Sequence, residues 1–334
     1  MSRRALLRTA LGIAISVAAG WILLRSVDVP AAIDVLRGAN LLIVGVMLVS
    51  VVFDVASRAA RWRALLVPIT RVPYLHVLGY TFVGYLANNV LPARLGELVR
   101  SHALGEGEGV SRTTVLGTVV VERIVDTVIV VALAATAVVV LGVGGIVSTA
   151  VVLGAAFVGV LLVGLAVAMV SHRLPGADRL VALIDRIPRV LDLGRRLREG
   201  LSVVSRPRTV AEALLFSGVA WGFSIFTFVL GGRAIGVDIT LAQGALLSSG
   251  VALATIVPSA PGYLGTFELT AVGIATQFAI DRDAAFAMAL LVHAMILLGT
   301  SIGGAISAVR LGVGLSIGGA EEGATPRGAA ARSG

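Results

Sequence analysis

The sequence contains no cysteine and no lysine, and charged residues of either sign are few. Without cysteine the chain can form no disulfide, no thiol nucleophile and no thiolate metal site. Its four histidines are scattered and show none of the spacings expected of metal ligands. All 27 basic residues are therefore arginine, against 19 acidic residues, which gives a net charge of +8. Charged residues make up only 14% of the chain, whereas soluble domains carry roughly 25%.

Long apolar runs dominate what remains. Of the 334 residues, 57% are hydrophobic, and the mean hydropathy is +0.98. A membrane-spanning helix needs about 20 apolar residues, so this length allows about six to eight spans. We therefore expect an all-α integral membrane protein, a polytopic helical bundle over residues 1–312, followed by a disordered tail at 313–334. Basic membrane proteins usually carry their excess charge in cytoplasmic loops, so the charge does not indicate nucleic-acid binding.

Two arginine-rich stretches predict the orientation of the chain. The first follows a predicted span at 41–57 and contains Arg58, Arg61, Arg63 and Arg71. The second, residues 172–208, carries nine arginines against four acids and should lie amphipathically against anionic lipid at the cytoplasmic surface. Both stretches and both termini are predicted to face the cytoplasm from the cell membrane. Asp54 and Arg58 are four residues apart and should pair on one helix face.

A broken hairpin is predicted between these two stretches. An even number of crossings must separate two cytoplasmic loops, yet three apolar segments lie between them. The shortest, Tyr74–Leu91, ends at two asparagines and Pro92, so we expect it to form with Arg94–Leu104 a hairpin that enters and leaves on one side. Arg112–Leu141 and Ile146–Ser171 then cross, and the glycine-rich residues 105–109 form a loop.

An internal repeat places a second hairpin. The five residues from Pro92 to Gly96 resemble those from Pro261 to Gly265, which lie 169 positions further along. The same reasoning puts the hairpin at 241–279 on the outer side, so the chain is predicted to contain two inverted repeats. Such transporters bind substrate near the midplane, where their broken helices meet. Position 123 lies about 16 Å along its helix, at about the right depth.

Charged side chains beside these breaks predict the site. Ionisable groups at membrane depth are costly and usually functional, and broken backbone there lines a cavity or is buried. Arginine forks suit phosphate, and the nearby carboxylates could receive a cationic headgroup or balance the arginines. We therefore expect a zwitterionic or phosphate-bearing substrate, and no enzymatic activity, metal or cofactor. The alternative is that these charges only pair to hold helices together.

Three motifs carry a family resemblance: PARLGE at 92–97, ERIVD at 122–126 and PGYLGTFE at 261–268. Over about residues 5–312 the chain resembles the lysylphosphatidylglycerol synthase transmembrane-region family, also called flippase-like proteins, which includes the membrane half of the multiple peptide resistance factor. The resemblance, with His293 added from the repeat, marks as substrate-binding Asn89, Pro92, Arg94, Gly96, Glu97, Arg100, Glu122, Arg123, Asp126, Pro261, Gly265, Glu268 and His293.

The resemblance implies movement of a lipid between leaflets, either an aminoacylated phosphatidylglycerol or a lipid-linked sugar. No soluble domain follows the last predicted span, so we do not expect the chain to synthesise lysylphosphatidylglycerol. The alternative function is a non-transporting membrane subunit that supports a lipid-modifying or glycosyltransferase partner. A buried charge cluster favours the first function, because a scaffold has no need for one.

Overall fold

The computed structural model of the chain describes residues 27–91, 95–145, 206–256 and 259–313, together with parts of 17–25 and 147–160. Two of the predicted site residues, Pro92 and Arg94, lie outside the described residues. So do the arginine-rich stretch up to residue 205, the tail from residue 314, most of residues 1–26, and most of the span predicted at 146–171.

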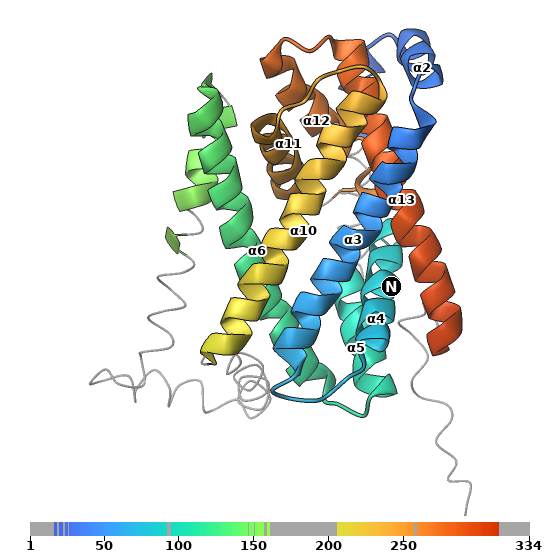
Figure 1. Cartoon of the computed structure of the whole chain (residues 1–334), viewed down its shortest axis with the longest axis vertical. Coiled ribbons are helices and arrows are strands. Elements are labelled where there is room, and N and C mark those ends of the chain that lie inside the picture. Colours follow the sequence, from blue (N-terminus) through green and yellow to red (C-terminus); the bar gives the residue numbers. More distant parts are fainter. Residues whose placement is uncertain are drawn as a thin grey trace, which may run out of the picture.

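Four of the described helices are long and apolar enough to cross a membrane, which confirms the helical membrane class. They are α3 (Leu41–Leu66), α6 (Arg112–Leu141), α10 (Pro207–Ala234) and α13 (Arg282–Leu311). Asn40 caps the start of α3 by accepting two backbone N–H groups, and Asp281 does the same for α13. Helices α6 and α13 both end at a glycine in the left-handed conformation. Figure 1 shows α3 and α10 packed side by side, with α6 and α13 on either side of them.

The shorter elements gather at the two ends of this bundle. Helices α4 (Tyr74–Val90) and α5 (Gly96–Gly107) form a hairpin in the lower half of Figure 1. The upper half holds α2 (Val29–Arg37), α11 (Leu241–Ala254) and α12 (Thr266–Ala275). The short helix η4 (Pro261–Tyr263) precedes α12 and contacts α4, and η5 (Thr276–Phe278) follows α12. Helices α6 and α13 start from opposite ends of the bundle (Figure 1). Each predicted hairpin region is therefore broken, and the two lie at opposite ends, while the repeat symmetry itself stays a prediction.

The predicted end of the second span was wrong. Helix α3 continues to Leu66, and Arg58 and Arg61 are buried inside it rather than exposed in a basic loop. The segment from 58 to 66 contains no proline or glycine that would stop the helix, and its arginines meet carboxylates from a neighbouring helix. The orientation argument at this loop therefore rests on Arg63 and Arg71, and the orientation stays a prediction. Helix α5 likewise runs to Gly107, into the predicted glycine-rich loop.

Helix α13 packs closely on α3 and α4 through three glycines. A Cβ atom on Gly299 would lie 3.1 Å from a side-chain carbon of Leu48 on α3. A Cβ on Gly303 would lie 2.5 Å from the ring of Phe82 on α4, and one on Gly304 would lie 2.4 Å from Cβ of Leu86. Small residues let membrane helices approach closely enough for their backbones to pack. This contact fixes the position of the first hairpin against α13.

We predict that Gly304→Ala lowers the melting temperature of the detergent-solubilised protein. The added methyl group would also lie 2.8 Å from the backbone oxygen of Phe82, and backbone cannot move aside as a side-chain tip can. Overpacking of this kind costs roughly 1–3 kcal/mol. Gly45→Ala is the matched control, because no atom lies within 4 Å of a Cβ at that α3 position. Equal melting temperatures for the two variants would contradict the packing.

We also predict that the two hairpins face opposite sides of the membrane. The chain has no cysteine, so Glu106→Cys and Arg282→Cys each create a unique thiol at an exposed position. One variant should react with a membrane-impermeant maleimide in intact cells, and the other only after permeabilisation. Reaction of both from the same side would rule out the opposed arrangement.

Candidate functional site

A cavity of about 280 Å³ lies in the middle of the bundle. Its lining includes Asp54 of α3, Asp126 of α6, Trp221 of α10 and Leu297 of α13. Each of these residues lies at or next to the midpoint of its helix. If the four helices span the membrane, the cavity lies at the depth where charge is most costly. Its volume is close to the lower end of the range for ligand pockets, so it suits a polar headgroup rather than a whole lipid.

Arg61 lies at the centre of a charge cluster beside this cavity. Glu122 and Asp126 are one turn apart on α6, and Arg61 contacts both. Its Nη2 lies 3.0 Å from Oε1 of Glu122 and 3.1 Å from Oδ2 of Asp126, while Nη1 bonds Oδ1 of Asp126. From α10, Ser217 accepts a hydrogen bond from Arg61 at 3.1 Å, and Trp221 donates one to Asp126 at 3.3 Å. The side chain of Arg61 is 0% exposed, so water does not reach these contacts. They join α3, α6 and α10.

Two further arginines approach the same carboxylates from the α5 side. Arg100 on α5 donates to Glu122 at 2.9 Å, and its guanidinium lies 4.5 Å above the ring of Trp62. Arg123 on α6 contacts Glu122 at 2.6 Å and Asp126 at 3.1 Å. Its remaining contact, to Glu97 of α5, is longer at 3.9 Å. The α4–α5 hairpin therefore supplies one arginine and one carboxylate to the cluster.

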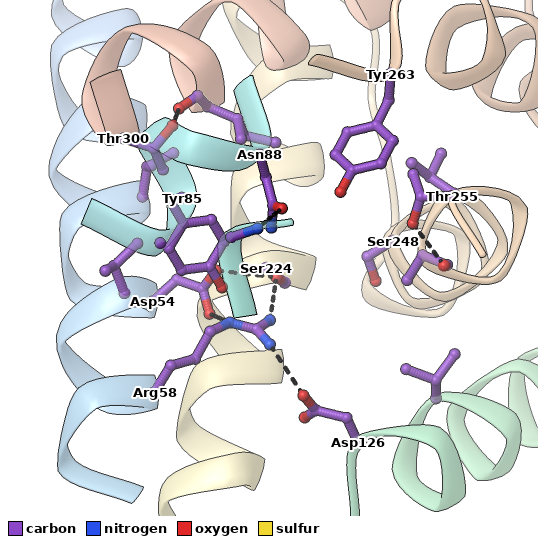
Figure 2. Close-up of a pocket in the computed structure, with 18 of the residues that line it drawn as sticks. Asp54, Arg58, Tyr85, Asn88, Asp126, Ser224, Ser248, Thr255, Tyr263 and Thr300 are labelled. Atoms are coloured by element: carbon purple, nitrogen blue, oxygen red, sulfur yellow. Dashed lines mark hydrogen bonds and ion pairs between the residues drawn. The ribbon is translucent and has the colours of Figure 1, made fainter. Parts of the chain in front are cut away.

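Arg58 links the cluster to the opposite part of the cavity. As predicted, it pairs with Asp54 one turn earlier on α3, at 2.8 Å. It also lies 3.7 Å from Asp126, and it donates to the hydroxyl of Ser224 at 3.4 Å. Figure 2 shows Arg58 between Asp54 and Asp126. Across the cavity from this chain of contacts, Figure 2 shows the neutral hydroxyls of Ser248, Thr255 and Tyr263.

The charges of this cluster balance. The four arginines (Arg58, Arg61, Arg100 and Arg123) face four carboxylates (Asp54, Glu97, Glu122 and Asp126), so the described cluster has no net charge. What distinguishes its members is access. The side chain of Arg123 is 41% exposed and that of Glu97 is 19% exposed, in contrast to the fully buried Arg61. Arg123 and Glu97 are therefore the charged groups best placed to meet a ligand.

The asparagines at the end of α4 hold the hairpin in place. Oδ1 of Asn88 accepts the backbone N–H of Gly96 at 2.8 Å, across the break between α4 and α5. A Cβ on Gly96 would lie 2.0 Å from the backbone oxygen of Gly84, so α5 can pack this closely only with glycine there. Nδ2 of Asn89 donates to the hydroxyl of Thr300 on α13 at 2.9 Å. These neutral contacts position Glu97 and Arg100 at the cavity.

Most of the predicted site residues that the structure describes line this cavity, namely Asn89, Gly96, Glu97, Arg100, Glu122, Arg123, Asp126 and His293. Three residues of the second motif do not. Pro261 and Gly265 belong to the turns before α12, and Glu268 lies behind His293, with Oε1 at 2.5 Å from Nδ1 of the imidazole. Their expected role as direct substrate contacts is thus not what the geometry favours; they shape the cavity wall.

Sequence reasoning missed several residues of the site. Arg58 was predicted to pair with Asp54 on a helix face, but both Arg58 and Arg61 were also counted in a basic loop, and neither was predicted to lie at the site. Trp221 and Ser224 on α10 gave no signal, because indole and hydroxyl groups are common in apolar spans. Tyr85 and Asn88 also line the cavity, and only the asparagine pair was noted as a break.

We predict that Arg61→Gln strongly destabilises the protein. The substitution leaves the buried cluster with an uncompensated negative charge at a position that water does not reach, which costs about 3–5 kcal/mol. We expect a lower yield and a lower melting temperature in detergent. The matched control is Arg208→Gln, because Arg208 also pairs with a carboxylate, Glu212 at 3.0 Å, but is 91% exposed. An ion pair as exposed as this one contributes little to the free energy of unfolding. Arg61→Gln melting like this control would contradict the structural role.

Comparison with known proteins agrees with this geometry. Residues 9–304 match a family model described as the lysylphosphatidylglycerol synthase TM region. A comparison with curated proteins found no match. The matched range includes both hairpins, the charge cluster and most of α13, and so covers well over half of the chain. The chain therefore belongs to the lysylphosphatidylglycerol synthase TM region family.

Proposed function

We propose that this protein moves a phosphate-bearing lipid between the leaflets of the cell membrane, without any covalent change to the lipid. One observation carries the proposal: a cavity at mid-helix depth is lined by a balanced charge cluster in which Arg123 remains 41% exposed. Family membership supports a role connected with membrane lipids. The inner charges hold the helices together, and the exposed ones are available to a headgroup.

Arg123 and Glu97 form the docking pair in this proposal. Their 3.9 Å contact is the longest ion pair of the cluster, so it is the contact most easily exchanged for a ligand. A phosphate oxygen in the cavity would accept from the exposed part of the Arg123 guanidinium fork. Glu97, released from Arg123, would then accept from an ammonium or hydroxyl group of the same headgroup.

The size and lining of the cavity suit a headgroup-only path. A volume of about 280 Å³ cannot also contain acyl chains, which would stay in the surrounding membrane while the headgroup crosses. The wall formed by α11 and η4 contributes the hydroxyls of Ser248, Thr255 and Tyr263 rather than charges. Such groups can hydrogen-bond a glycerol, a sugar or the amide of an aminoacyl group. An aminoacylated phosphatidylglycerol and a lipid-linked sugar are therefore the two cargo classes that we propose.

A non-transporting membrane subunit is the second proposal, and the charge balance is the observation that favours it. The cluster carries no net charge, and Arg61 joins three helices through contacts that water does not reach. A protein that only supports a lipid-modifying enzyme or a glycosyltransferase would need no more than this. The two proposals differ in what happens when the exposed charges are removed.

We predict that Arg123→Gln and Glu97→Gln slow lipid movement while leaving the fold intact. Arg123 lines the cavity and its side chain is 41% exposed, unlike that of Arg61, so water can screen the charge that its removal leaves. Loss of one charge-assisted contact to the headgroup costs about 1.5–3 kcal/mol, which corresponds to roughly a 10–100-fold lower rate. The measurement uses proteoliposomes with phosphatidylglycerol labelled on an acyl chain, whose outer-leaflet fraction is quenched by dithionite.

The control for this experiment is Arg310→Gln, an exposed arginine near the end of α13 that does not line the cavity. It should melt and transport like the unsubstituted protein. A stable Arg123→Gln, Glu97→Gln double variant that moves lipid at the unsubstituted rate would reject the translocase and favour the supporting subunit.

A further inference from the structure

A second ionisable pair, Glu268 and His293, lies in the cavity wall away from the arginine cluster. Oε1 of Glu268 on α12 lies 2.5 Å from Nδ1 of His293 on α13, and both residues are buried, at 4% and 3% exposure. The imidazole lines the cavity, and the carboxylate lies behind it. An imidazole that lines the proposed headgroup path is thus in contact with a buried carboxylate that does not line it.

The local fold holds this pair rigidly. Oε2 of Glu268 accepts the backbone N–H of Gly265 at 2.7 Å, where a φ of +80° lets the chain turn into α12. The ring of Phe267 stacks on the imidazole with centroids 4.1 Å apart, and Phe228 stacks on Phe267 at 6.0 Å. The carboxylate is therefore enclosed by a backbone amide, an imidazole and apolar rings.

The pair differs from the rest of the site in the nature of its cation. In the described part of the chain, each carboxylate that lines the cavity contacts an arginine, which is always charged. Glu268 instead contacts a histidine, which can gain or lose a proton near neutral pH. A buried carboxylate facing a neutral imidazole would be left without compensation, at a cost of several kcal/mol.

From this arrangement we infer that Glu268 and His293 form a proton-binding site that couples proton movement to passage of an anionic headgroup. The inference rests on the proposed lipid translocation. An anionic headgroup entering the cavity favours proton binding at the pair, because the added positive charge attracts the anion. By linkage, proton binding raises the affinity for the anionic headgroup by the same factor. The proton leaves when the headgroup does, so a pH difference across the membrane can bias the direction of movement.

Other ionisable groups around the pair do not replace it. Across the cavity, the side chains of α3, α5 and α6 that face it are the arginines and carboxylates already paired with one another, and α4 and η4 add the tyrosines Tyr85 and Tyr263. Helix α11 carries no ionisable residue, and the other charges of α13 lie at its ends. On α2 and α10, Asp28, Asp34, Arg37, Arg208, Glu212 and Arg233 do not line the cavity. The pair is thus the titratable histidine–carboxylate unit of the described cavity.

Proton uptake on lipid binding tests the inference directly. Short-chain phosphatidylglycerol is added to the detergent-solubilised full chain in weak buffer near pH 7, and a pH-sensitive dye reports protons taken up. The unsubstituted protein should take up about one proton per bound lipid. His293→Gln should take up none, and neither should Glu268→Gln, which keeps the volume of the side chain. His76→Gln is the matched control, because His76 also contacts a glutamate, Glu108 at 2.9 Å, but is half-exposed and outside the cavity.

Transport with an imposed pH difference separates this inference from the proposed function. In proteoliposomes, a difference of about one pH unit should change the ratio of the two directional rates about tenfold in the unsubstituted protein and in His76→Gln. The ratio should not respond in His293→Gln or Glu268→Gln. Lipid movement that ignores the pH difference, with no proton uptake on binding, overturns the inference and leaves the translocase standing. Absence of lipid movement under every condition rejects the translocase and, with it, the coupling of protons to headgroup passage.

Discussion

The neutralisation of Glu122 and Asp126 by Arg61 is the interaction on which the rest of the structure depends. Two carboxylates one turn apart on α6 would be prohibitive at membrane depth, and Arg61 contacts both from a position that water does not reach. To bring Arg61 there, α3 must stay helical beyond the point where its apolar run ends. Ser217 and Trp221 complete the contact from α10, so the relative positions of three long helices follow from one charge requirement.

The same network becomes less tightly held toward the cavity. Arg61 is fully buried and makes two hydrogen bonds to Asp126. Arg123 is partly exposed, and its contact with Glu97 is longer, at 3.9 Å. In the proposed translocase, this difference in exposure lets a single cluster both stabilise the bundle and offer charges to a headgroup. The opposite wall follows a different chemistry, because Glu268 is matched by a titratable imidazole rather than by an arginine. A cavity with one permanently charged side and one titratable side can respond to both phosphate and protons.

Local patterns in the sequence predicted the features that depend on local physics. Helix α6 was predicted from 112 to 141 and has these bounds, because thirty helix-compatible residues end at Gly142 in the left-handed conformation. The break after Leu91 was predicted from the two asparagines and Pro92, and α4 ends one residue earlier, at Val90. Arg61 was misassigned because its partner, Asp126, is 65 residues away, and an arginine count near a helix end says nothing about distant carboxylates. The contacts of Ser217 and Trp221 on α10 could not be predicted for the same reason, because their partners are also distant in the sequence.

We propose that a lipid headgroup enters the cavity between α6 and the α4–α5 hairpin. Photocrosslinking tests this most directly, using phosphatidylglycerol with a diazirine at the glycerol headgroup and peptide mapping of the labelled chain in proteoliposomes. We expect labels on the cavity-lining peptides of α5 and α6 that include Glu97 and Thr127, with competition by unlabelled lipid. Labels confined to exposed outer positions such as Val139, with none in the cavity, would contradict it.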